Sequence, residues 1–186
     1  CDGLVVPAVC TYRLPTGFPA DVAALLEPLG CGVRPLLDEE VAGSTIVVLG
    51  AGPIGLMHVQ LAKISGARVI VSDLVRARLE KAREVGADAL IDASQADPVQ
   101  RVKDLTDGRG ADVIIVAVGA PKAQQQALEM AGLCATINYF AGTYPPATIP
   151  LDPNLIHYKQ IRLTGTHDFS PLDFRNALRF IELGMV

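Results

Sequence analysis

The amino-acid sequence predicts a doubly wound α/β fold, in which a parallel sheet of six strands lies between two layers of helices. The run TIVVL at 45–49 is apolar and rich in β-branched residues, as in a parallel strand buried on both faces. A glycine-rich turn follows it and leads into a segment with helical spacing. Strand-like and helix-like segments then alternate, which indicates βαβ units in the three-layer Rossmann order 3-2-1-4-5-6.

Each later element is predicted from its own pattern. Apolar runs bounded by turn residues predict strands at 67–72, 89–91, 112–118, 134–140 and 161–166. Helical periodicity predicts helices at 56–65, 76–85, 98–105, 122–131 and 172–183. Asp97 before Pro98 is typical of a helix start, and Ser170 or Asp168 is expected near the start of the last helix. The proline-rich stretch 143–154 is expected to be a loop.

The first 40 residues are expected to lie outside this unit. Prolines and glycines interrupt 1–19, and the short apolar runs at 4–6 and 9–10 predict strand fragments. We therefore expect 1–40 to be the remnant of a preceding domain with a connecting helix. Residues 41–186 are then a Rossmann domain that is truncated at its C-terminus, and the whole chain is a piece of something larger.

The connecting helix is expected at 20–37. Asp21 is the expected N-cap, because its side chain can accept from a backbone N–H group of the first turn. Pro28 lies inside the apolar pattern and lacks a backbone N–H, so we expect the helix to break or kink near Glu27.

Composition excludes several classes of protein. Half of the residues are hydrophobic and 19% are charged, which favours a folded core. A net charge of −4 and a pI near 5.3 argue against a nucleic-acid surface. No apolar run is long enough to cross a membrane, and no signal peptide is visible. The four cysteines form no CxxC pair, and free thiols suit the cytoplasm.

The glycine-rich turn has the pattern GxGxxG, in which each residue has a physical role. Gly50 allows the tight turn out of the strand, Gly52 lets the backbone approach a pyrophosphate, and Gly55 allows close packing of helix on strand. Pro53 suits the first helical turn. It is followed by Ile54, and the N–H groups of this turn form an anion site together with the helix dipole.

An acidic residue ends the second strand at the spacing that dinucleotide-binding sites use. Asp73 lies 21 positions after Gly52, close to the expected spacing of about 20 residues. Its carboxylate can accept hydrogen bonds from both ribose hydroxyls of adenosine and would repel a 2′-phosphate, which favours NAD over NADP. The alternative is a glycine-rich structural turn in an α/β protein that binds no nucleotide.

The strand order places a ligand crevice at the carboxyl ends of the first and fourth strands. Besides the glycine turn and Asp73, the expected lining comprises Val118-Gly119 and the segment from Tyr139 through Phe140 and Ala141 to Gly142. For this last segment, ordinary packing between strand and loop is the alternative to contact with a cofactor.

Several stretches resemble the medium-chain dehydrogenases. The similarity is carried by 48–63 (VLGAGPIGLMHVQLAK), the acidic and basic run 72–88, the upstream LLEPL at 25–29, and the stretches 138–142 and 165–167. The pattern is most similar to the zinc-dependent branch of sorbitol, threonine and related polyol or alcohol dehydrogenases. The resemblance covers nearly the whole chain and implies its coenzyme-binding domain.

The resemblance implies a role for individual residues. The glycine turn would hold the pyrophosphate and Asp73 the adenosine ribose. Arg78 matches a basic residue beside the adenosine, and a solvated helix charge is its alternative reading. Val118 would lie near the adenine-side ribose, and Phe140 and Ala141 near the nicotinamide.

Glu27 matches an acid that lies at the catalytic zinc in this family. Its alternative reading is a charge or cap on the kinked helix. The family's other zinc ligands, its structural zinc loop and its C-terminal tail have no counterpart in this sequence. Cys31, His58, His157 and His167 show no ligand spacing that would replace them, and His58 is expected to be a packed side chain. No catalytic residue is therefore expected in this chain, and the isolated piece should be inactive.

The leading hypothesis is the NAD-binding domain of a zinc-dependent dehydrogenase that acts on a small alcohol or polyol. A zinc-free, NADPH-dependent relative similar to quinone reductases is one alternative, although Asp73 and Glu27 argue against it. A non-catalytic NAD(H)-binding sensor is another. We also expect a homo-oligomer, because in this family the sixth strand pairs with its copy, and 161–164 would otherwise leave an apolar edge bare.

Overall fold

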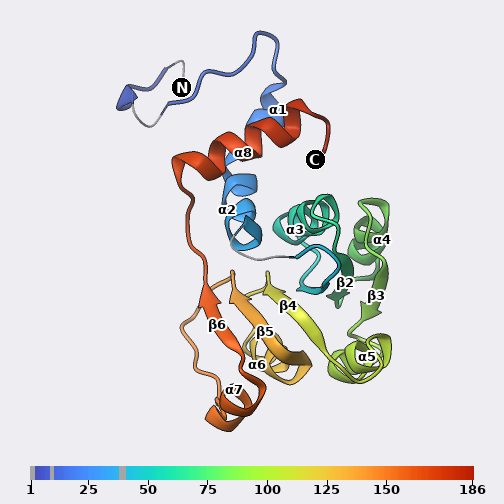
Figure 1. The fold of residues 1–186 in the computed structure, drawn as a ribbon. Coiled ribbons are helices and arrows are strands. Elements are labelled where there is room, and N and C mark those ends of the chain that lie inside the picture. The colour runs from blue at the N-terminus through green and yellow to red at the C-terminus, as the bar shows by residue number, and fades with distance from the viewer. Residues whose placement is uncertain (1–2, 9–10, 38–40) are drawn as a thin grey trace.

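The computed structural model describes residues 3–8, 11–37 and 41–186, and a sheet of six strands forms its centre (Figure 1). The strands lie in the order β3-β2-β1-β4-β5-β6, and all neighbouring pairs are parallel. The predicted Rossmann order is therefore confirmed. The strands are β1 (Thr45–Leu49), β2 (Arg68–Asp73), β3 (Ala89–Asp92), β4 (Ala111–Val116), β5 (Ala131–Tyr139) and β6 (Arg162–Gly165).

Helices cover both faces of the sheet, and two separate apolar clusters show this. One cluster joins residues of α2, α3, α4 and α8 to Ile46 and Val48, and the other joins α5 and α6 to Val47 and Leu49. Successive side chains of β1 thus enter opposite layers, as the period of a strand requires. The helices are α1 (Ala20–Ala23), α2 (Leu26–Leu37), α3 (Pro53–Ile64), α4 (Arg76–Glu84), α5 (Pro98–Leu105), α6 (Pro121–Met130), α7 (Pro153–Lys159) and α8 (Pro171–Glu182).

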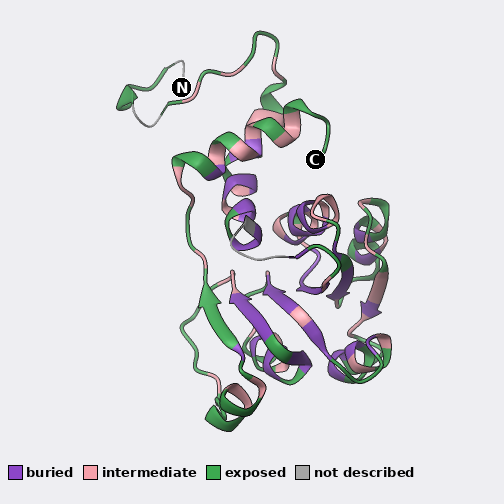
Figure 2. Cartoon of the chain, in the orientation of Figure 1, coloured by how far each residue is buried: buried purple, intermediate pink, exposed green. Residues whose placement is uncertain are grey.

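Burial is deepest in the middle of the sheet. Every residue of β1 is buried. Every residue of β6, by contrast, is exposed, and this strand is green in Figure 2. β6 is the last strand on its side of the sheet and therefore forms one of its two edges. Among the described residues, no helix is long and apolar enough to cross a membrane.

The N-terminal prediction of strand fragments is wrong at 4–6. Leu4 and Val5 are 81% and 99% exposed and belong to no strand. This segment extends away from the sheet, beyond α8 (Figure 1). Without a neighbouring strand, its backbone cannot form a ladder. The second predicted fragment, at 9–10, lies outside the described residues.

The connecting helix breaks earlier than predicted. α1 ends before Ala24 and α2 begins at Leu26, so Pro28 falls in the first turn of α2, where its missing N–H costs no helical hydrogen bond. The N-cap of α1 is Pro19, without a side-chain hydrogen bond, and Asp21 lies in the first turn instead.

Side-chain caps begin α5, α7 and α8. Asp97 caps α5 by accepting from the Val99 N–H at 3.1 Å, as predicted. Ser170 caps α8 in a capping box with Asp173, as one of the two predicted candidates. The stretch expected to be a loop leads into a short helix, α7, which Asp152 caps by accepting from the Asn154 N–H at 2.9 Å. Arg34 of α2 donates to Asp173 Oδ2 at 3.1 Å, which fixes the start of α8 against α2.

Candidate functional site

The loop between β1 and α3 is shaped by glycines. Gly50 has a φ of +101°, which side chains rarely adopt, and a Cβ atom there would lie 3.1 Å from the Val118 Cβ. A Cβ atom at Gly55 would collide with the Gly50 carbonyl oxygen. At Gly52, by contrast, no atom lies within 4 Å of an added Cβ. The loop therefore needs Gly50 and Gly55 for its own geometry, whereas Gly52 leaves space open beside the backbone.

The first turn of α3 faces this open space. Pro53 is its first residue, and Gly52 is an N-cap without a side-chain hydrogen bond. The N–H groups of a first helical turn have no intrahelical acceptors, and the helix dipole adds positive potential there. The turn that includes Ile54 can therefore receive an anionic group such as a pyrophosphate.

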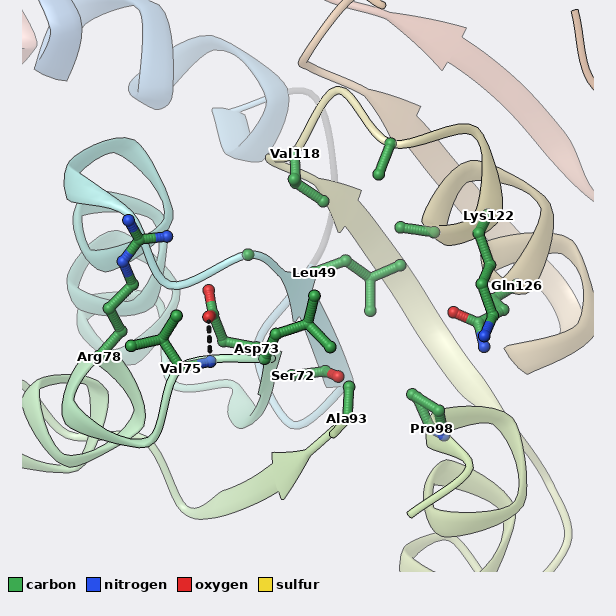
Figure 3. A pocket seen from close by; sticks show the side chains of 14 residues that line it. Leu49, Ser72, Asp73, Val75, Arg78, Ala93, Pro98, Val118, Lys122 and Gln126 are labelled. Carbon is green, nitrogen blue, oxygen red and sulfur yellow. Dashed lines mark hydrogen bonds between the residues drawn. The ribbon is translucent and has the colours of Figure 1, made fainter. Parts of the chain in front are cut away.

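Asp73 ties this loop to the end of β2. Its Oδ2 atom accepts from the Ala51 N–H at 2.7 Å, and its Oδ1 atom accepts from the Val75 N–H at 2.8 Å (Figure 3). Each carboxylate oxygen has capacity for a further hydrogen bond. Asp73 can thus hold the loop in place and still accept from a ligand hydroxyl.

A cavity of about 240 Å³ opens beside Asp73 at the carboxyl ends of the strands. It is smaller than the roughly 300–1,000 Å³ of sites that hold a drug-sized ligand, so it fits one part of a dinucleotide. Four residues expected at the coenzyme line it: Gly50, Asp73, Arg78 and Val118. Its further lining is mostly apolar, with a few polar side chains: Leu49, Ser72, Leu74, Val75, Ala93, Pro98, Ala120, Lys122, Ala123 and Gln126.

The other predicted cofactor residues lie outside this cavity. An added Cβ at Gly119 would collide with the Gly142 carbonyl oxygen, so the loops after β4 and β5 touch. The Ala141 N–H donates to the Val116 carbonyl at 2.9 Å. Phe140 packs its ring against His58, with centroids 4.7 Å apart and planes at 82°. These residues form a second part of the carboxyl edge, next to α3.

His58 is a packed side chain, as predicted. It is fully buried, and neither ring nitrogen has a hydrogen-bond partner in the part of the chain that the structure describes. Burial lowers the pKa of His58 to about 4. The ring is therefore neutral near pH 7.

The sequence pattern did not predict Lys122 and Gln126 of α6 as site residues. They lie one turn apart and line the cavity opposite Asp73, Val75 and Arg78 (Figure 3). Their spacing of four residues, just after the fourth strand, is the only signal for them in the sequence. That spacing alone does not show which face of a helix turns toward a neighbouring strand.

Glu27 belongs to a cluster of possible metal ligands. The Cys31 thiol lies one turn further along α2 and donates to Glu27 Oε1 at 3.5 Å. Asp168 joins them from the loop before α8, and the three donor atoms lie within 4.8 Å of one another. The sequence pattern did not bring Cys31 together with Glu27 and Asp168, because it was compared only with the histidines.

Two carboxylates and a thiol are chemically suited to Zn²⁺, and three protein ligands leave a fourth position open. Burial raises the pKa of Cys31 to about 11, and the negative charge of Glu27 adds to this. The thiol is therefore protonated near pH 7 unless a cation binds beside it.

The chain matches a family model described as zinc-binding dehydrogenase over residues 53–182, which is more than half of its length. It is 40% identical over 163 residues to L-threonine 3-dehydrogenase from Pyrococcus horikoshii, covering 87% of this chain and 46% of that protein. It is 35% identical over 176 residues to sorbitol dehydrogenase from Halalkalibacterium halodurans, covering 91% and 50%. The chain thus spans about half the length of the curated relatives it matches.

The fold is also similar to solved structures. One, from Sinorhizobium meliloti 1021, is described as a zinc-binding dehydrogenase bound to NADP. It superposes with a TM-score of 0.86 at 28% identity, over 94% of this chain and 52% of that one.

Proposed function

Because this chain belongs to the zinc-binding dehydrogenase family, we propose that it is the domain that binds NAD(H) in an oxidoreductase. The full-length protein would transfer hydride between NAD and a small alcohol or polyol. The observation that carries this proposal is the bond from the Ala51 N–H to Asp73, which holds an open glycine loop beside an apolar cavity. Positioning of the nicotinamide is the contribution of such a domain to catalysis.

The coenzyme would lie along the carboxyl edge of the sheet. The loop from Gly50 to Gly55 would hold the pyrophosphate, and Asp73 would accept from the adenosine ribose. Val118 and Arg78 line the adenosine cavity. Toward its nicotinamide end, the coenzyme would follow the loops after β4 and β5, which contain Gly119, Phe140 and Ala141.

The preference for NAD over NADP is part of the proposal. The Asp73 carboxylate would repel a 2′-phosphate, whereas the Arg78 guanidinium in the same cavity would attract one. We place the carboxylate closer to the ribose, because it is fixed by two backbone amides, whereas Arg78 is exposed on α4. Fixed charges act more strongly on a bound group than mobile, solvated ones do.

Zinc would lie at Glu27 in the full-length protein. The support is the donor set of Glu27, Cys31 and Asp168, which brings two carboxylates and a thiol together. When bound, zinc supplies Lewis acidity to a substrate oxygen. Glu27 and Cys31 share one face of α2, so they would hold a cation on a rigid element.

Two further features of the full-length protein belong to the same proposal. β6 exposes the edge of the sheet, and we propose that it pairs with its copy in a homo-oligomer. We also propose a cytoplasmic location, which the free thiols of Cys31 and Cys134 support.

The test is titration calorimetry of the 186-residue chain with NADH and NADPH. We expect tighter binding of NADH, and we expect Asp73→Ala to abolish the preference. The ratio of the two affinities is the readout, because Asp73 also holds the loop. Equal or better binding of NADPH would contradict the NAD assignment and favour the zinc-free reductase alternative. Failure of both to bind would mean that the glycine turn is structural.

The sensor alternative needs a separate test on the full-length protein. Turnover of a polyol or alcohol with NAD, lost on chelation of zinc, would exclude a purely non-catalytic sensor. A full-length protein that binds NADH and never oxidises such substrates would instead support the sensor.

A further inference from the structure

The adenosine cavity has a second polar wall, which faces Asp73 from α6. Gln126 is half-buried and lines the cavity, as does Lys122 one turn earlier (Figure 3). In the described parts of the chain, the Gln126 amide has no hydrogen-bond partner. This wall therefore offers unused hydrogen-bonding groups to whatever enters the cavity.

Three consecutive glutamines on α6 have three different environments. Gln124 is buried and donates from Nε2 to the Ala141 carbonyl at 3.3 Å, so its role is structural. Gln125 is exposed and lies outside the cavity lining. Gln126 alone among the three faces the cavity. Gln125 is thus a matched control for the function of the Gln126 amide.

The remaining surfaces of the cavity suit a flat ring. Apolar groups come from the ends of three strands and from the start of α5, among them Leu49, Val75, Val118 and Pro98. They can cover the faces of a nucleobase, while its polar edge needs a hydrogen-bonding partner. With the ribose at Asp73, a base that extends across the cavity reaches α6.

We infer that Gln126 recognises the base of the coenzyme and selects adenine over hypoxanthine, an inference that rests on the proposed function. A glutamine amide can accept from the adenine 6-amino group and donate to an adjacent ring nitrogen, the pairing that proteins use for adenine elsewhere. Hypoxanthine has a carbonyl in place of the amino group. That carbonyl oxygen would face the amide oxygen of Gln126, and two hydrogen-bond acceptors repel each other. The amide would otherwise have to rotate.

If Lys122 were the group that recognises the base, the preference between adenine and hypoxanthine would be reversed. An ammonium only donates hydrogen bonds, so it would favour the carbonyl of hypoxanthine. Lys122 is exposed, whereas Gln126 is half-buried, so the amide is the group held within the cavity. The sign of the preference therefore distinguishes the two side chains.

The test compares NADH with its hypoxanthine analogue, reduced nicotinamide hypoxanthine dinucleotide, by calorimetry on the 186-residue chain. We expect the parent chain to bind NADH roughly tenfold tighter. Gln126→Leu should bring the two affinities together by weakening NADH. Gln125→Leu, the matched control, should leave both affinities unchanged, and unaltered circular dichroism shows that each variant is folded.

Three results would overturn the inference while NADH binding persists. They are equal affinities in the parent chain, a preference that survives Gln126→Leu, and a preference that Lys122→Met removes. If the parent chain binds neither dinucleotide, the proposed coenzyme function itself fails, and the inference fails with it.

Discussion

Ala51 donates its backbone N–H to the Oδ2 atom of Asp73 at 2.7 Å, which joins the glycine-rich loop after β1 to the end of β2. The second carboxylate oxygen accepts from Val75 at the start of the next connection. Asp73 is thus a structural anchor of two loops as well as the candidate partner of a ribose. Hydrogen bonds to a charged group contribute more to stability than neutral ones do.

Asp73→Ala should therefore destabilise the chain even without coenzyme. We expect the free energy of unfolding to fall by about 2 kcal/mol, because two backbone N–H groups lose a charged acceptor. Urea unfolding of the two proteins measures this. Glu129→Ala, on an exposed position of α6, should change stability by less than about 0.5 kcal/mol. Equal stability of Asp73→Ala and the parent would show that water replaces the carboxylate at no cost.

Protonation of His58 should lower the stability of the fold over a defined range of acidic pH. Burial lowers its pKa from 6.5 to about 4 in the folded state, so the unfolded chain binds the proton first as the pH falls. Stability contributed by the neutral ring is full above pH 6.5 and is lost between pH 6.5 and about 4. The loss should be about 3 kcal/mol.

His58→Leu should remove this dependence on pH and raise stability near neutrality. The substitution replaces a buried imidazole that has no hydrogen-bond partner among the described residues with an apolar group. Chemical unfolding at several pH values between 4 and 7 provides the measurement. His157→Leu serves as the control, since His157 is exposed. An unchanged acid profile in His58→Leu would mean that other groups cause the loss.

The sheet was predictable because its signal is local. Apolar runs such as 45–49 must be buried on both faces, and the turn residues between runs set the order of elements. α7 was missed because a helix of seven residues after several prolines has too few turns to show a period. The strand predicted at 4–6 failed for a different reason, because strands depend on partners that a sequence pattern does not specify.

The candidate site was only partly predictable. Asp73 follows from its position at the end of a strand, a one-dimensional property. The role of Gln126 depends on which side of α6 faces the cavity, and that is decided by packing. The meeting of Cys31 with Asp168 depends on the docking of α8 against α2, which Arg34 and Asp173 hold together. Such contacts between distant segments leave no mark in local spacing.

Cys31 should be far less reactive than Cys134. Burial and then the charge of Glu27 raise the pKa of Cys31 to about 11, so its reactive thiolate is scarce at pH 8. Cys134 is exposed. Alkylation by iodoacetamide, followed at each cysteine by peptide mass spectrometry, should label Cys134 before Cys31.

Glu27→Gln should speed the labelling of Cys31, since it removes the nearest negative charge and replaces the carboxylate acceptor with a neutral amide oxygen. The labelling rate of Cys31 should rise a few-fold, while that of Cys134 stays the same. Faster labelling of Cys31 than of Cys134 in the parent chain would contradict the raised pKa. An unchanged rate in Glu27→Gln would show that burial alone protects the thiol.

Alanine substitutions at Gly52 and Gly55 should distinguish an effect on coenzyme affinity from an effect on folding stability. At Gly55 an added methyl would collide with the Gly50 carbonyl oxygen, so Gly55→Ala should lower the free energy of unfolding by about 3 kcal/mol. At Gly52 the methyl meets no atom within 4 Å, and φ is −72°, which alanine adopts freely. Gly52→Ala should therefore cost less than about 1 kcal/mol in stability.

The affinity for NADH should fall in Gly52→Ala even though the fold is kept. The methyl group would occupy the space that the pyrophosphate needs beside the first turn of α3, so binding should weaken roughly tenfold or more. Urea unfolding and calorimetry on the same two variants provide both readouts. A stable Gly52→Ala chain that binds NADH as the parent does would place the phosphates elsewhere. The open space at Gly52 would then be a property of the turn alone.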